Sequence, residues 1–172
     1  MASFISNRDP GAKPGALQKD TLCFVVLVKE HTRGFNETNV QVSKGIMELF
    51  LVICDSHENE QCPIPTWVAR DMTSISCSKI ADKKLSPISK SLLLSACVVA
   101  APLVILGQAY ESISNIKSPL AQEEFLHWMK SFAETFGAAS LGSGLKDAVA
   151  FLSKVRRTMM VSVTVGLSSG LP

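Results

Sequence analysis

Cysteine and histidine are the residues whose types and spacing come nearest to a site of chemistry. Cys54, His57, Cys62 and Cys77 follow one another closely, and two residues separate the first pair, as in many zinc sites. The later spacings match no common zinc module, and small buried thiols often serve as ordinary core residues. The pattern favours structural thiols and no metal, with zinc as the alternative.

No other group of residues has the spacing of an enzyme active site. The glycines Gly137, Gly142 and Gly144 lack the lysine and the preceding strand that a nucleotide-binding loop needs. The histidines are scattered, and no serine lies in a nucleophile-elbow pattern. We therefore expect a non-enzymatic protein that needs no cofactor.

Composition predicts a single domain that meets a partner or a lipid surface. The chain has 172 residues, of which 47% are hydrophobic and 19% charged, and its formal net charge is +2. This apolar content exceeds that of a typical soluble domain, whereas the charge is too small to indicate a dedicated nucleic-acid binder. The odd number of cysteines, with no signal peptide at the start, indicates reduced thiols in the cytosol.

Basic residues gather in two short groups that are candidates for contact with phosphates. One precedes the most apolar part of the chain and the other lies near its end. Both are also compatible with ordinary solvated faces, because exposed lysines are common. The groups are Lys79, Lys83, Lys84 and Lys90, and Lys154, Arg156 and Arg157.

Runs of β-branched and aromatic residues predict a small, mainly antiparallel sheet. An acidic loop with two prolines, 55–65, interrupts it, and Trp67 then either closes that loop onto the sheet or inserts into lipid. Within the longest strand Glu48 alone breaks the apolar pattern, which favours a structural anchor. The predicted strands are 22–29, 40–42, 46–54, 103–106 and 159–165.

Two serine–proline pairs predict helix starts, at Ser86 and at Ser118. The first helix should end near Ala100, and a shorter helix is expected over 145–155. The uncharged segment 91–110 is long enough to span a membrane, but its central proline argues against this. An apolar stripe in the second helix ends before Gly137 and comprises Phe125, Trp128, Met129, Phe132 and Phe136.

Together these elements predict an α+β fold, in which two or three helices cover the sheet. Residues 1–20 should form a flexible N-terminal arm, because they contain few large apolar side chains. A single globular domain should occupy 21–166, followed by a loose tail over 167–172.

The stretch 35–67 resembles the core strand and following loop of rhabdovirus matrix proteins. The shared residues are Gly45, Glu48, Leu49, Ile53, Asp55 and Pro63, with Trp67 displaced by one position. The short chain is similar to the compact matrix proteins of plant rhabdoviruses of the cytorhabdovirus type. It lacks the lysine-rich arm and the proline–tyrosine release motif of the animal-virus proteins.

This resemblance implies a structural protein of the virion, located between envelope and nucleocapsid and, in the host, in the cytoplasm and at the inner membrane surface. Its partners would be further copies of itself, the viral nucleoprotein–RNA and an anionic membrane, with the viral glycoprotein as a further candidate. Lys79, Lys83, Lys84 and Trp67 would contact the membrane. The expected self-association arm carries Arg8, Lys13 and Lys19, and the expected nucleocapsid contact is Lys154, Arg156 and Arg157. The alternative is a viral coat or nucleocapsid protein that binds RNA.

Overall fold

The described part of the chain is entirely helical. The computed structural model describes residues 14–31, 37–137, 149–151 and 153, and these contain no β strand. The predicted α+β fold is therefore wrong for this part of the chain. The helices are α1 (Pro14–His31), α2 (Val40–Asn59), α3 (Thr66–Lys79), α4 (Ser86–Val99), α5 (Pro102–Asn115) and α6 (Pro119–Phe136).

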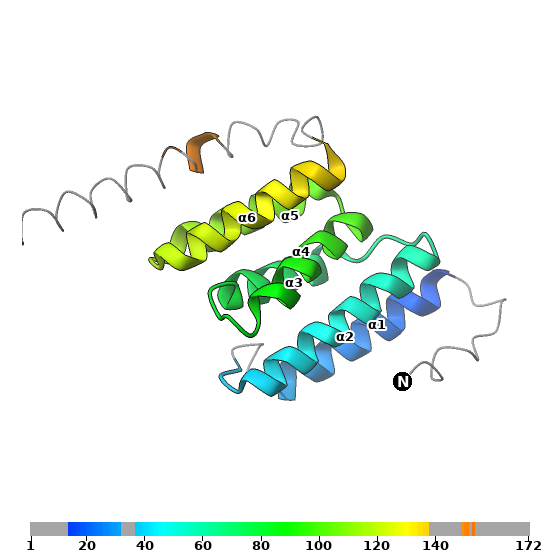
Figure 1. Ribbon diagram of the computed structural model, residues 1–172. Helices are drawn as coiled ribbons and strands as arrows, with labels where there is room; N and C mark the ends of the chain where they lie inside the picture. The colour runs from blue at the N-terminus through cyan, green and yellow to red at the C-terminus, as the bar shows by residue number, and fades with distance from the viewer. Residues whose placement is uncertain (1–13, 32–36, 138–148, 152, 154–172) are drawn as a thin grey trace, which may run out of the picture.

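The helices stack as three antiparallel pairs in two layers (Figure 1). One layer contains α2, α4 and α6, and the other contains α1, α3 and α5. Each pair contributes one helix to each layer, so that α1 faces α2, α3 faces α4 and α5 faces α6. Stacked helical pairs of this kind are the architecture of α-solenoid repeat proteins, in which each pair contacts only its neighbours.

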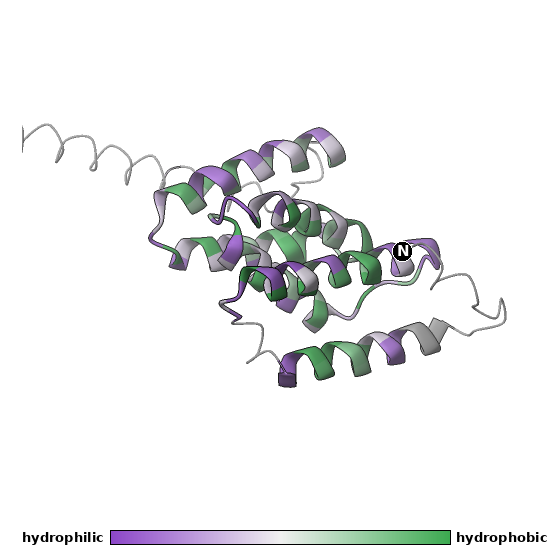
Figure 2. Ribbon diagram, turned by 60° about the horizontal axis from the view of Figure 1, so that its bottom comes forward, coloured by the Kyte–Doolittle hydropathy of each residue, from purple (hydrophilic) through white to green (hydrophobic). Residues whose placement is uncertain are grey.

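The predicted strand 22–29 lies inside α1. Its run of apolar residues covers both sides of the helix, which hides the helical period (Figure 2). Thr21 and Val25 are buried one turn apart, whereas Leu22 and Val26 are exposed. A short continuous apolar run cannot be assigned to strand or helix by periodicity alone, and here the β-branched residues favoured the wrong choice.

The predicted strands 40–42 and 46–54 both belong to α2. Asn39 caps the helix, because its side-chain oxygen accepts hydrogen bonds from the backbone N–H groups of Gln41 and Val42. Glu48 is exposed and pairs with Lys44 one turn earlier, at 3.3 Å, so it is not an anchor in a sheet. The buried stripe has helical spacing and comprises Ser43, Ile46, Met47, Phe50, Cys54 and His57.

The connection between α2 and α3 is shorter than the predicted loop 55–65, because α2 continues to Asn59. Pro65 precedes α3, and Trp67 lies in the first turn of that helix. The backbone N–H of Ile64 donates to the carbonyl of Val99, which joins this connection to the end of α4. The predicted strand 103–106 is also wrong, since α5 begins at Pro102.

The helices predicted from serine–proline pairs are confirmed. α4 starts at Ser86 and its C-cap is Ala100, although Ser86 is the first helical residue and not the cap. Ser118 caps α6 by accepting from the N–H of Ala121, and Gly137 follows the helix with a φ of 78°. Proline stands in the first turn of α4, α5 and α6, where its missing N–H costs nothing.

The apolar stripe of α6 packs on α4 and α5, not on a sheet. Phe125, Trp128 and Phe132 are fully buried. Phe151, from the helical residues 149–151, is also buried, and its ring lies 5.2 Å from that of Phe125 in an edge-to-face arrangement. Aromatic side chains thus cover this end of the stack.

Several predicted segments are corrected or untested at the chain ends. Residues 14–20 of the expected flexible arm are helical and open α1. The remainder of the arm, 1–13, lies outside the described residues, as do the predicted strand 159–165 and the tail 167–172.

Candidate functional site

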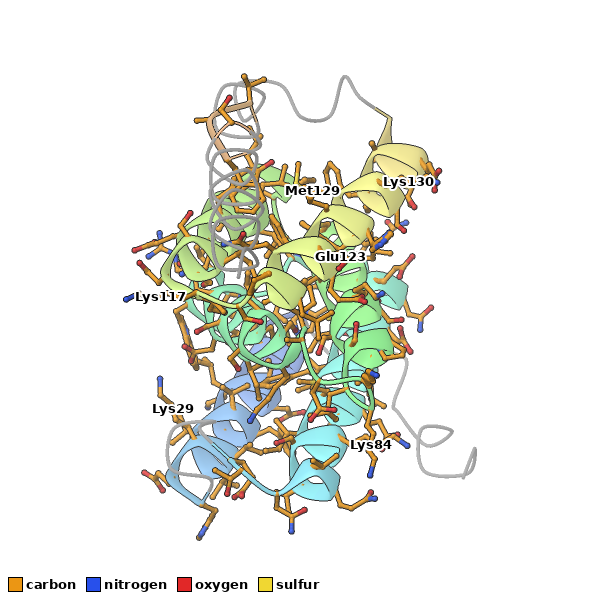
Figure 3. All side chains as sticks on the ribbon, turned by 60° about the vertical axis from the view of Figure 1, so that its left-hand side comes forward. Lys29, Lys84, Lys117, Glu123, Met129 and Lys130 are labelled. Atoms are coloured by element: carbon orange, nitrogen blue, oxygen red, sulfur yellow. The ribbon has the colours of Figure 1, made fainter. Side chains whose placement is uncertain are left out.

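One edge of the stack joins the two layers and carries several lysines. The ends of α1, α3 and α5 and the starts of α2, α4 and α6 meet there, through the connections 80–85 and 116–118 and the described residues 37–39. Figure 3 views this edge and shows Lys84 and Lys117 pointing away from the helices. We call it the lysine edge, and its members are Lys79, Lys83, Lys84 and Lys117.

Lys79 differs from the other lysines because it holds the edge together. Its ammonium group donates to the backbone carbonyl of Glu37 at 2.6 Å, which joins the end of α3 to the residues before α2. Its side chain is half-buried. Lys79 was predicted to contact the membrane together with Lys83 and Lys84, but in the structure its side chain stabilises the fold.

Lys83 and Lys84 are exposed on a turn of fixed shape. The carboxylate of Asp82 accepts from the backbone N–H groups of Lys84 and Leu85, at 2.8 and 3.3 Å. Side-chain acceptance of this kind closes an Asx turn. Leu85 is buried beneath the turn, so the two lysine side chains are directed into solvent.

Lys117 belongs to the same edge, although the sequence did not indicate it as a contact residue. It is exposed and lies directly before the cap Ser118, as Lys84 lies shortly before Ser86. A lysine just ahead of a serine–proline helix start therefore occurs twice in the chain, and that repetition was the available signal.

An ion pair connects two of the helices that start at this edge, α4 and α6. Lys90 of α4 and Glu124 of α6 lie 2.7 Å apart, and the hydroxyl of Ser86 donates to the same carboxylate oxygen at 2.9 Å. The hydrogen bond from Lys90 lowers the pKa of the Glu124 carboxyl most strongly, and the hydrogen bond from Ser86 lowers it further. The pair sets the relative position of α4 and α6 under Lys83 and Lys84.

Trp67 does not join these lysines. It stands at the opposite end of α3 from Lys79, about 18 Å away along the helix axis. Trp67 is 38% exposed. The predicted membrane contact is thus divided between two edges of the stack, and its lysines and its tryptophan form no continuous patch.

The other predicted contact residues lie mostly outside the described part of the chain. Lys19 is exposed on α1. The self-association residues Arg8 and Lys13 and the nucleocapsid group Lys154, Arg156 and Arg157 are not among the described residues.

The possible zinc ligands are occupied in other ways. The Nδ1 atom of His57 donates to the backbone carbonyl of Cys62 at 2.9 Å, and its Nε2 atom shares a hydrogen bond of 2.9 Å with the hydroxyl of Thr21. Burial raises the pKa of the Cys54 and Cys77 thiols to about 12. Among the residues that the structure describes, no three potential ligands gather around one point.

The surface of the described residues includes a cleft at each of two places. One, of about 460 Å³, is lined by the end of α2 and the end of α4 and includes His57, whose ring nitrogens are both engaged. The other, of about 340 Å³, lies between α3 and α5 beside the lysine edge. Most of its lining residues are of polar type, among them Gln108, Glu111 and Asn115.

Comparison with known proteins gives two distant similarities. The chain is 25% identical over 126 residues to Centrosomal protein 224 of Dictyostelium discoideum, covering 72% of this chain. It is 27% identical over 124 residues to Protein MOR1 of Arabidopsis thaliana, covering 71% of this chain. The matched segment is 6% of the length of each relative. No protein-family model and no solved structure matches the chain.

The membrane-spanning alternative for 91–110 has no continuous helix to support it. The segment is divided between α4 and α5 at Ala100 and Ala101. Within the described ranges, no helix combines the length and apolar content that crossing a bilayer requires.

Proposed function

We propose that this chain is a non-enzymatic, protein-binding segment of helical-repeat type, of the kind that builds a large centrosomal assembly protein. The observation that carries the proposal is the stack of helical pairs with lysines on one edge. Stacked pairs create extended surfaces for partners. The similarity to a centrosomal protein many times longer supports a role as one segment of an assembly.

The lysine edge is the proposed contact surface. Lys83, Lys84 and Lys117 project from short turns that the fold holds in place. Cations on a fixed scaffold select acidic surfaces and speed association with them, in a manner that salt weakens. The partner is therefore an acidic protein surface.

The strand predicted over 46–54, which accompanied the resemblance to matrix proteins, is wrong, because that segment is part of helix α2. Neither relative named above is viral. The virion function and the RNA-binding alternative stay predictions, and the binding experiment includes both.

The test is co-sedimentation of the purified chain with isolated centrosomes, with vesicles of anionic phospholipid and with single-stranded RNA. We expect binding to centrosomes that falls as salt rises, and a loss of about tenfold in the K84E/K117E variant. The matched control is R70E/K130E, which reverses two exposed charges away from the edge.

Two results contradict the proposal. Binding to vesicles or RNA without binding to centrosomes would mean that the lysines bind phosphate groups and not an acidic protein surface. Equal loss in K84E/K117E and R70E/K130E shows that net charge, and not the lysine edge, governs the interaction.

A further inference from the structure

The two ends of the stack differ in how they are covered. At one end Phe151 packs on Tyr110 and Phe125 of the last pair. At the other end α1 contacts α2, and Lys29 pairs with Asp71 of α3 at 3.1 Å. The outer side of α1 carries apolar residues that no described residue covers, although terminal units of repeat proteins normally have a polar outer face.

The exposed apolar residues of α1 are large and adjacent. Leu22 is 36% exposed, Val26 is 45% exposed and Leu27 is 53% exposed. Cys23 is exposed between them. Figure 2 shows this helix at the end of the stack, with hydrophobic turns in its middle and hydrophilic turns towards its ends. Contiguous exposed apolar side chains of this kind mark interaction surfaces.

The exposed face of α1 is complementary to itself in the antiparallel direction. Lys19, Cys23, Val26 and Glu30 are spaced by four, three and four residues, which places them in one line down the helix. Two copies of that line, related by a twofold axis near residue 24, bring Lys19 of one copy opposite Glu30 of the other. Cys23 then lies opposite Val26, and both contacts occur twice.

The flanks of this line support the same arrangement. Leu22 lies on one side of it and Leu27 on the other, so each copy contributes apolar area to both sides of the seam. A parallel arrangement would instead place Lys19 against Lys19 and Glu30 against Glu30. Like charges opposite one another oppose association, so the charges select the antiparallel direction.

We infer that the protein self-associates through α1, which packs antiparallel against α1 of a second copy. The occupant of the exposed face is thus another copy of this chain, and the dimer has twofold symmetry. Each copy contributes a single helix to the contact. The buried area is therefore small, as is typical of reversible interfaces. The inference is independent of the proposed centrosomal partner and of the lysine edge.

Sedimentation equilibrium of the full chain over a range of concentrations tests the inference. We expect a reversible monomer–dimer equilibrium. K19E and E30K alone should each weaken the dimer by about tenfold, because each creates two like-charge contacts. The double variant K19E/E30K restores both contacts with reversed sign and should return the dissociation constant to that of the parent.

A matched pair of variants distinguishes an effect at the exposed face of α1 from a general effect of added charge. V26D should abolish the dimer, whereas V98D should leave it unchanged, because Val98 is 48% exposed on α4 and is not part of the outer face of α1. Circular dichroism checks that each variant is folded.

Cross-linking tests the direction of packing. In a C23S background, mixing K19C with E30C should give disulfide-linked dimers, while either variant alone should not. A monomer at all concentrations, unchanged dimerisation in the charge variants, or cross-linking of K19C to itself would each overturn the inference.

Discussion

At the scale of single residues, burial determines which chemistry the side chains can perform. The thiols of Cys54, Cys77 and Cys97 are buried, and burial raises the pKa of each to about 12. The imidazole of His57 connects α1, through Thr21, to the backbone after α2. Cysteine and histidine thus serve the fold here, whereas the sequence alone left zinc as an alternative.

Thiol titration tests this assignment. The thiolate is the reactive form and the reagent must reach it, so the three thiols with raised pKa values and the buried Cys62 should be inert at pH 8. At protein concentrations that keep the chain monomeric, we expect an aromatic disulfide reagent to modify Cys23 alone in the folded protein, and all five cysteines in denaturant. C23S should remove the fast reaction, and a second fast thiol in that variant contradicts the assignment.

A second prediction at this scale concerns Glu124 and pH. Hydrogen bonds from Lys90 and Ser86 lower the pKa of its carboxyl in the folded state. The unfolded chain therefore binds a proton at higher pH than the folded chain does. The contribution of Glu124 to stability is full above the unfolded pKa and is lost as pH falls through the folded pKa.

The variant E124Q removes this contribution. At neutral pH it should reduce the free energy of unfolding by about 1 kcal/mol, because the ion pair is partly exposed. The difference from the parent should shrink as pH falls below the usual range for glutamate. Urea denaturation at several pH values measures this difference in the free energy of unfolding. The control is E123Q, a variant of the exposed neighbouring glutamate. A difference that does not change with pH argues against the ion pair.

At the scale of elements, α2 separates the sequence-based prediction from the structure most clearly. Gly45 lies between the predicted strands 40–42 and 46–54, but in the structure it is inside α2, and a methyl group built on it would meet no atom within 4 Å. Alanine is favoured over glycine inside a helix. Gly45→Ala should therefore raise the free energy of unfolding by about 0.5–1 kcal/mol.

Two further glycines provide controls for that prediction. Gly107 lies in α5, also with open space around it, and Gly107→Ala should stabilise to a similar extent. Gly137 has a φ of 78°, which alanine adopts poorly, so Gly137→Ala should destabilise. Thermal denaturation of the three variants gives the comparison. If Gly45→Ala destabilises as Gly137→Ala does, residue 45 is not in a regular helix.

Helices whose starts are marked by a local sequence signal could be predicted, whereas helices that depend on packing could not. The starts of α4 and α6 were predicted, because a serine–proline pair marks a helix start whatever packs around it. The assignments of α1 and α2 failed, since their β-branched residues suit a strand and only stacking against neighbouring helices decides for the helix. Proline also precedes α3 and opens α5, but the prolines of 55–65 are interpreted from the sequence as interrupting the sheet, and Pro102 as evidence against a membrane-spanning helix.

The lysine edge shows the same limit at the site. Lys83 and Lys84 were selected correctly as exposed cations, because clustering is visible in the sequence. Lys79 and Trp67 were grouped with them by proximity in the chain. A helix separates Trp67 from these lysines and brings Lys79 to the carbonyl of Glu37. Lys117 precedes Ser118 much as Lys84 precedes Ser86, so the sequence marks both lysines as neighbours of a helix start, but only the stacking of pairs places them on one edge.

At the scale of the whole molecule, the stack makes stability depend on position. The pair α3 and α4 has helical neighbours on both sides, whereas α1 packs on one side only. In a stack where each pair contacts only its neighbours, opening one end costs fewer contacts than opening the middle. Local stability should therefore be greatest at the central pair and least in α1.

Hydrogen exchange of the full chain, followed by mass spectrometry at low protein concentration, measures this gradient. We expect the amides of α3 and α4 to exchange roughly ten times more slowly than those of α1, or slower still. V26D lies on the outer face of α1 and should leave the central pair unchanged, whereas Leu92→Ala, at a fully buried position in α4, should speed exchange throughout. Equal protection in all six helices would instead mean that the stack opens as one cooperative unit, and that its end has no separate mobility for a second copy to reduce. Raising the protein concentration distinguishes these cases directly, because association through α1 slows exchange in α1 first and in the remaining helices only through their contacts with it.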